Sequence, residues 1–149
     1  MLTQEVPLYR LELVRERSIP FKKGATTEQR VEILHNLLDR CPVEEFVVLY
    51  IDSDANVVGC EKIASGNVNS VQVILTKIFR GAIVACVNKI VLGHNHPTGN
   101  ATPSVEDIFL TEKAIEAGML LKIDVMDHII VCPDGSHTVM SEHPYITIE

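Results

Sequence analysis

Residues 89–107 read KIVLGHNHPTGNATPSVED, a strand-forming run that leads into two histidines and then into the start of a helix. The segment Lys89–Leu92 is rich in apolar and β-branched residues, which predicts a strand. His94 and His96 follow at positions i and i+2, so on an extended backbone their imidazoles leave the same face about 6 to 7 Å apart. Asp107 then falls on the first turn of the predicted helix.

The two histidines and the aspartate match the ligand chemistry of zinc. Two neutral imidazole nitrogens and one carboxylate oxygen make a three-ligand set, and the fourth tetrahedral position is left to water. A single histidine near a strand end is usually hydrogen-bonded or exposed, and we interpret the remaining candidates in this way: His35, His137 and His143. Because the pairing, Pro97 and a well-placed acid occur together, we predict that His94, His96 and Asp107 bind Zn2+.

The segment from Ser104 to Asp107 supports two interpretations. A serine three residues before an acid, at the start of an apolar helix, is typical of an N-cap that satisfies free backbone donors. Because residues i and i+3 share a helix face, Asp107 can also bind the metal while Ser104 directs its hydroxyl at a neighbouring water or substrate oxygen. The histidine pair just upstream favours this second interpretation.

A hydrolytic zinc site also needs a base that accepts the proton of the attacking water. The chain has no HExxH motif, so the base must be a carboxylate elsewhere. Glu44, Glu45 and Glu61 are candidates, and the first two directly precede an apolar run at Phe46–Ile51. Solvated acids in a loop are an equally good interpretation, so the residues alone leave this choice open.

Size and composition bound the class of protein. The chain of 149 residues is 46% hydrophobic and 22% charged, which indicates one globular domain with its own core. Neither a membrane span nor a signal sequence is evident, so we expect a cytoplasmic protein. The four cysteines are far apart and form no CxxC pair, which predicts small buried side chains and argues against a structural zinc cluster or a dense disulfide framework.

The formal net charge of −7 weighs against a protein that holds nucleic acid by its phosphates. Basic residues gather only near the N-terminus, where we interpret them as a solvated face: Arg10, Arg15, Arg17, Lys22 and Lys23. We therefore expect no direct nucleic-acid binding and no membrane association. Exposed strand edges in a small α/β domain are compatible with a homodimer.

The first half of the chain predicts strands around one helix. Leu8–Val14 alternates apolar and polar residues and predicts an early strand. A capping box at Thr26–Gln29 predicts a helix that ends near Asp39. Phe46–Ile51 is nearly all apolar, which predicts a strand buried on both faces, and a tight turn joins it to a second strand over Val57–Ile63.

The second half begins after a break at residues 66–70. Val71–Ala85 places its apolar residues, Ile83 among them, on one stripe and predicts a helix. Ser104–Ala117 predicts a third helix that ends at Gly118. Three strands are expected after it, the last two joined by a turn at 133–135: Leu120–Val125, His128–Val131 and Thr138–Ser141. Such a mixture of hairpins and helices indicates an α/β or α+β sandwich in one domain.

The predicted site resembles a known pattern. Residues 94–107 are similar to the HxHPx(6)SxxD motif of the JAMM (JAB/MPN+) metalloprotease domains, whose members also carry an upstream glutamate. More specifically, residues 94–104, Asp127–Val131 and Val6–Leu11 resemble the RadC family, the UPF0758 group. This similarity covers essentially the whole chain.

The resemblance implies a role for each matching residue. The JAMM histidines and aspartate bind Zn2+, which corresponds to His94, His96 and Asp107 in this chain. The serine that stabilises the oxyanion corresponds to Ser104. These roles agree with the ligand set argued from the residues themselves.

The resemblance also selects among the candidate bases. RadC-like sequences carry Glu-x-Phe ahead of the core strand, which corresponds to Glu44 and favours it over Glu45 as the acid and base. Asp127 and His128 match the Asp-His pair of the family. We expect them to have structural or metal-supporting roles without binding metal.

The fold and function implied by the resemblance follow. The family fold is a cytidine-deaminase-like JAB/MPN sandwich of three layers with a mixed sheet flanked by helices, and residues 1–149 would form one such domain with no helix-hairpin-helix region. The implied function is a zinc-dependent hydrolase of the metallopeptidase or isopeptidase type, acting on a peptide or protein substrate. The alternative is an accessory module of DNA repair or replication with a structural or vestigial metal site. A deaminase would need a CxxC ligand set that this chain lacks.

Overall fold

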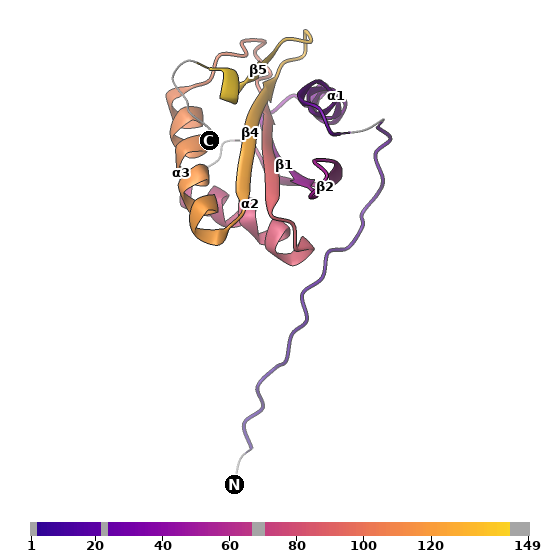
Figure 1. The fold of residues 1–149 in the computed structure, drawn as a ribbon, viewed down its shortest axis with the longest axis vertical. Coiled ribbons are helices and arrows are strands. Elements are labelled where there is room, and N and C mark those ends of the chain that lie inside the picture. Colours follow the sequence, from indigo (N-terminus) through magenta and orange to yellow (C-terminus); the bar gives the residue numbers. More distant parts are fainter. Residues whose placement is uncertain (1–2, 22–23, 67–70, 144–149) are drawn as a thin grey trace.

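A computed structural model of the chain describes residues 3–21, 24–66 and 71–143. One five-stranded sheet forms the middle layer, with the strand order β2-β1-β3-β4-β5, and helices cover both of its faces (Figure 1). The strands are β1 (Glu45–Ile51), β2 (Val57–Ser65), β3 (Lys89–Asn95), β4 (Asp124–Val131) and β5 (His137–Val139). The helices are α1 (Thr27–Leu38), α2 (Val71–Ala85), α3 (Val105–Leu121) and the short 3-10 helix η1 (Met140–Glu142).

The sheet is mixed, as the family resemblance implied. β1 pairs antiparallel with both β2 and β3, whereas β3 and β4 run parallel and are joined through α3. β4 and β5 form a second antiparallel hairpin. The predicted single-domain sandwich of the α/β (α+β) class, with a mixed sheet flanked by helices, is confirmed.

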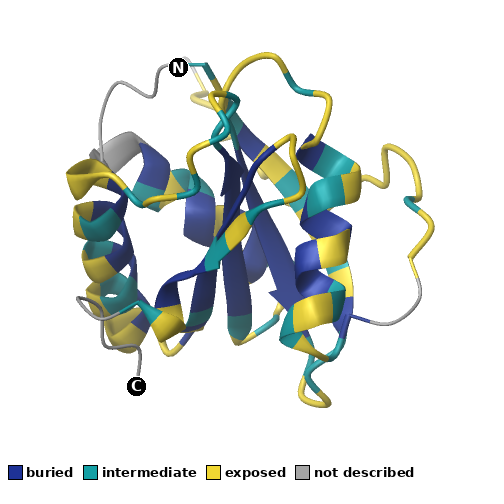
Figure 2. Ribbon diagram, turned by 90° about the horizontal axis from the view of Figure 1, so that it is seen from above, coloured by how far each residue is buried: buried dark blue, intermediate teal, exposed yellow. Residues whose placement is uncertain are grey.

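The two faces of the sheet carry separate cores, and the buried residues lie in the sheet and on the inner sides of the helices (Figure 2). On one face, Phe46 and Leu92 pack with α2 and α3. On the other, Val47 and Leu49 pack with α1. Because neighbouring residues of β1 point to opposite faces, its almost entirely apolar sequence is needed for both cores.

Helices α1 and α2 lie where the sequence predicted them. The Thr26 side chain accepts a hydrogen bond from the Gln29 amide, and the Gln29 side chain accepts one from the Thr26 amide, so α1 begins with a complete capping box. The bounds of α2 are the predicted ones, but Ile83 is 55% exposed and does not belong to its buried stripe. The predicted break at residues 66–70 lies, apart from Gly66, outside the described residues.

The predictions for the segment after α3 were partly wrong. Residues 120 and 121 continue the helix, and the two strands expected over Leu120–Val125 and His128–Val131 are one strand, β4. The reason is that α3 ends later than predicted, at Leu121, and is capped by Lys122 in a left-handed conformation with φ of 60°. Thr138–Ser141 was also too long, since β5 ends at Val139 and η1 follows.

Gly118 lies inside α3 because another part of the backbone approaches it. The carbonyl oxygen of Ile123 would lie 2.3 Å from a Cβ atom at position 118. The Ile123 amide in turn donates to the Gly118 carbonyl at 2.9 Å, which holds the chain as it turns from α3 into β4. The glycine therefore permits a close backbone contact within the helix and is not the residue that ends it.

The predicted early strand at Leu8–Val14 was wrong. Residues 3–18 are exposed and extend away from the sandwich (Figure 1). Leu8 is 99% exposed and Leu11 is 78% exposed. The alternating pattern predicts a strand only where a partner is available, and among the described residues none pairs with this segment.

The cysteines also departed from expectation. All four are free thiols, but only Cys132 is buried, so the expectation of four small buried side chains was wrong for the other three. Cys60 is exposed because β2 is an edge strand with alternating burial, and Cys86 is exposed because it follows the end of α2. Among the helices of the described part of the chain, none is long and apolar enough to cross a membrane.

Gly118→Ala should destabilise the fold. Alanine favours a helix by about 1 kcal/mol over glycine, but a Cβ atom 2.3 Å from the Ile123 carbonyl oxygen forces the backbone to move. Such overpacking costs about 1–3 kcal/mol, so the clash outweighs the helix preference. Urea unfolding measures the change, with Met119→Ala on the exposed side of α3 as the control. An unchanged or raised midpoint for Gly118→Ala would contradict the close contact.

Candidate metal centre

Four side chains with metal-binding atoms meet at the carboxyl end of β3. One ligand atom from each of Glu44, His94, His96 and Asp107 lies within 4.8 Å of all the others. The Nε2 atoms of the two histidines are 2.9 Å apart. The carboxylate of Asp107 completes a triangle, with Oδ1 at 3.2 Å from His94 Nε2 and Oδ2 at 3.2 Å from His96 Nε2.

Strand pairing positions the two histidines. His94 is the second-last residue of β3, where it pairs with Phe46 of β1 and Ile130 of β4. The Phe46 ring stacks on the His94 imidazole with 6° between their planes. The His96 amide donates to the Val131 carbonyl at 3.0 Å and so continues the line of the strand after β3 ends. Both imidazoles therefore project toward the start of α3.

Local hydrogen bonding determines which nitrogen of His96 faces the cluster. Its Nδ1 lies 2.7 Å from the backbone carbonyl oxygen of Asn100. A carbonyl oxygen can only accept, so Nδ1 carries the hydrogen and the neutral ring has its lone pair on Nε2. Gly99, with φ of 88°, forms the turn that brings this carbonyl back to the histidine. The tautomer of His96 is thus the one that a metal ligand requires.

Asp107 both caps α3 and faces the histidines. Its Oδ2 accepts from the Ser104 amide at 2.8 Å, and its own amide donates to Ser104 Oγ at 3.0 Å. Burial raises the pKa of Asp107, but the contacts that its carboxylate makes with the protonated forms of His94 and His96 lower this pKa by more, so the group stays ionised. The same contact with Asp107 favours the protonated form of His96 and raises the pKa of His96, despite burial. Asp107 can therefore take part in the helix cap and also face the two histidines, so the two interpretations of this segment do not exclude each other.

Ser104 occupies the N-cap position of α3. Its Oγ accepts from the Asp107 amide, which leaves the hydroxyl hydrogen for another acceptor. The residue is exposed, and its amide bonds to the Asp107 oxygen that lies 3.2 Å from His96 Nε2. The capping role is observed, and the role toward a substrate oxygen stays a prediction.

The three candidate bases lie in different surroundings. Glu44 is 47% exposed and its Oε1 lies 3.8 Å from His94 Nε2. Glu45 instead pairs with Lys62 at 2.8 Å, and hydrogen bonding to Lys62 lowers the pKa of Glu45. Glu61 accepts from the Tyr50 hydroxyl at 2.6 Å and pairs with Arg80 at 2.7 Å, away from the histidines. Only Glu44 of the three belongs to the cluster.

Asn95 is a site residue that the sequence reasoning missed. Its side chain is nearly fully buried and contacts the loop that carries Glu44. Oδ1 accepts from the Glu45 amide at 2.7 Å, while Nδ2 donates to the carbonyls of Val43 at 3.0 Å and Cys41 at 3.4 Å. An asparagine supplies both an acceptor and two donors, which this loop requires. The only signal in the sequence was its place between the histidines.

The geometry fits a tetrahedral metal ion. Zinc bound at about 2.0–2.2 Å places neighbouring ligand atoms about 3.3 Å apart. The separations of 2.9 and 3.2 Å among His94, His96 and Asp107 are close to that value. Glu44 lies further out and on the exposed side. The cluster can therefore hold a metal ion through three residues and leave one position open.

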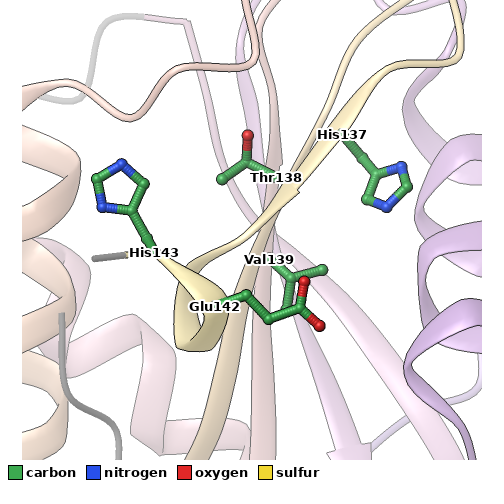
Figure 3. Close-up of a pocket in the computed structure, with 5 residues that line it drawn as sticks. All are labelled: His137, Thr138, Val139, Glu142 and His143. Atoms are coloured by element: carbon green, nitrogen blue, oxygen red, sulfur yellow. The ribbon is translucent and has the colours of Figure 1, made fainter. Parts of the chain in front are cut away.

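The other histidines do not form a second site in the described part of the chain. His137 and His143 line a hollow of about 240 Å3 with Thr138, Val139 and Glu142, but they point to opposite sides of β5 (Figure 3). His35 bonds to Asp39 at 2.7 Å. None of these histidines joins the cluster around His94.

A mixed-sheet sandwich with this histidine and carboxylate cluster defines a JAB-type domain with a possible metal site. The RadC-like JAB domain family matches residues 25–144, so the chain belongs to this family. A UPF0758 protein of Methanosarcina mazei is 31% identical over 127 residues, covering 85% of this chain and 55% of that protein. One from Desulforamulus reducens is 44% identical over 94 residues, covering 63% and 40%. The chain thus spans about half the length of these curated relatives.

Asn95→Asp should loosen the loop that carries Glu44 while the three candidate metal ligands stay in place. The aspartate keeps the acceptor for the Glu45 amide but sets a charged oxygen against two carbonyls, which costs about 1–3 kcal/mol. We expect faster hydrogen exchange at residues 43–45 and metal affinity within a few-fold of the wild type. Asn100→Ala, which keeps the carbonyl that holds His96, is the control. Unchanged hydrogen exchange at residues 43–45 in Asn95→Asp would show that Asn95 does not hold this loop.

Proposed function

We propose that this domain is a zinc-dependent hydrolase that cleaves a peptide or isopeptide bond. The observation that carries the proposal is the convergence of His94, His96 and Asp107, with Glu44 beside them on the exposed side. Structural zinc sites are usually closed by four protein ligands, whereas catalytic sites keep one position open. Three close donor atoms and one more distant carboxylate support a catalytic zinc site.

The donor set supports zinc as the metal. Two imidazole nitrogens and one carboxylate suit zinc, whereas magnesium and calcium prefer oxygen ligands throughout. A zinc ion held there supplies Lewis-acid chemistry for a carbonyl substrate and acidifies water. The remaining chemistry falls to the side chains of this chain.

Glu44 would transfer the protons. Its carboxylate is the one ionisable group of the cluster that is substantially exposed, so it can meet both water and the leaving amine. It would accept a proton from the attacking water and deliver it to the amine nitrogen. The Ser104 hydroxyl hydrogen, which the helix cap leaves available, would donate to the oxyanion of the tetrahedral intermediate.

An accessory role near DNA, with a purely structural metal, is the competing function. The net charge of −7 does not favour phosphate binding, which rests on clustered Lys and Arg. Three of the basic N-terminal residues, Arg10, Arg15 and Arg17, lie on the exposed extended segment outside the sandwich. The hydrolase is therefore the better supported function, and experiment can separate the two.

His96→Ala should abolish stoichiometric zinc binding. The substitution removes one of three close donors and leaves Asp107 with one histidine partner. Zinc per chain, measured by elemental analysis after dialysis, should fall from near one to near zero. His137→Ala is the matched control, because His137 lies outside the cluster. Full zinc occupancy in His96→Ala would show that the ligands are assigned wrongly.

Glu44→Gln should remove hydrolysis and keep zinc. Loss of a general base lowers a rate by about 10²–10⁴-fold. Peptide and lysine-isopeptide libraries, with products identified by mass spectrometry and a chelator as blank, give the readout. Glu45→Gln is the matched control, since Glu45 pairs with Lys62 and lies outside the cluster. Zinc-loaded wild type that cleaves neither library, or equal rates for wild type and Glu44→Gln, would refute the proposal.

A further inference from the structure

Behind His94 lies a buried row of hydrogen bonds that the proposed chemistry does not use. His94 Nδ1 is 2.7 Å from His128 Nε2 of β4. His128 Nδ1 is 2.6 Å from Thr111 Oγ1 of α3, and Thr111 Oγ1 is 2.7 Å from the backbone carbonyl oxygen of Asp107. His94, His128 and Thr111 are each 0% exposed, so water has no access to them.

The direction of this row follows from its last contact. Two oxygens 2.7 Å apart need a hydrogen between them, and the carbonyl of Asp107 has none, so the Thr111 hydroxyl donates to it. Thr111 Oγ1 can then only accept from His128, which requires the hydrogen on His128 Nδ1. The lone pair of neutral His128 is therefore on Nε2.

The same logic determines the state of His94. Because His128 Nε2 can only accept, His94 Nδ1 must carry the hydrogen and donate it. Neutral His94 is left with its lone pair on Nε2, the atom that faces His96 and Asp107. In the opposite tautomer His94 would present an N–H to the cluster and could not bind a metal.

We propose that Thr111 and His128 are positioning residues that fix the metal-binding tautomer of His94 through this hydrogen-bond row. The proposal rests on the metal site proposed above and deepens it. The row begins at one ligand, His94 on β3, and returns to the main chain of another, Asp107 on α3. It thus fixes the orientation of His94 and joins three elements of the sandwich.

Phe46 restricts the alternatives open to the two imidazoles. Its ring is parallel to that of His94, with centroids 5.7 Å apart, and meets the His128 ring at 61°. An aromatic face offers no strong acceptor, so a flipped His94 or His128 would lose its partner in a buried site. The packing therefore holds the rings in the orientation that the hydrogen bonds need.

Thr111→Val and Thr111→Ser form the matched pair that tests the proposal. Valine keeps the shape of the side chain and removes the acceptor for His128, whereas serine keeps the hydroxyl. Zinc affinity, measured by competition with a chromogenic chelator, should fall by about 10–100-fold in Thr111→Val and stay near the wild-type value in Thr111→Ser. Equal affinity in Thr111→Val and wild type would overturn the proposal, as would equal weakening in both variants.

A second readout needs neither zinc nor turnover. Imidazole ¹⁵N correlation spectra of the metal-free protein, at a pH well above the usual pKa of histidine, report which ring nitrogen carries the hydrogen. We expect Nδ1–H for both His94 and His128 in the wild type and in Thr111→Ser, and a loss of this pattern in Thr111→Val.

The tautomer experiment separates this proposal from the proposed function. An Nε2–H signal for His94 in the metal-free wild type would refute the proposed role of Thr111 and His128, even if the enzyme were active. Failure to cleave any substrate would leave the tautomer result standing. Thermal unfolding of the three metal-free proteins checks that Thr111→Val is folded; a stability change without a change of tautomer would show a merely structural threonine and refute the proposal.

Discussion

The alternation of side chains along β3 is the constraint on which the site depends. His94 faces the cluster and the start of α3, while Asn95, the next residue, contacts the loop before β1. At the end of this one strand, consecutive residues therefore supply a candidate metal ligand and the support of the candidate base. The strand can do so because both of its faces are buried, so each side chain has fixed partners. A shift of register by one residue would exchange the two roles.

Much of the fold could be predicted because its signals are local. The capping boxes at Thr26 and Ser104 and the β1–β2 hairpin are each specified by a few neighbouring residues. The errors concern contacts that a residue pattern does not record. Leu8–Val14 has the composition of a strand but no partner among the described residues. Gly118 has the pattern of a helix end, but it lies inside α3 because the backbone at Ile123, just beyond the helix, folds back against it.

Some residues of the candidate site could likewise be predicted from the sequence, and others could not. The spacing of His94, His96 and Asp107 could be recognised because the three lie within one short stretch, and the structure brings their ligand atoms together. The residues alone could not choose Glu44 over Glu45; the family resemblance favoured it, and Glu45 turns out to face Lys62. The contacts of Asn95 and Thr111 were not foreseen, because their partners lie in other elements. The only signal in the sequence was that both are polar residues close to the candidate ligands, Asn95 between the two histidines and Thr111 in the helix that begins near Asp107.

The closeness of the three ligands in the chain has a thermodynamic consequence. Residues 94–107 contain all three, so the unfolded polypeptide can also gather them around an ion by closing short loops. A ligand that binds the unfolded chain as well stabilises the fold by less than its affinity for the native state suggests. The melting temperature would then rise less with zinc than the affinity of the folded site alone predicts, because part of that binding free energy is also available to the unfolded chain.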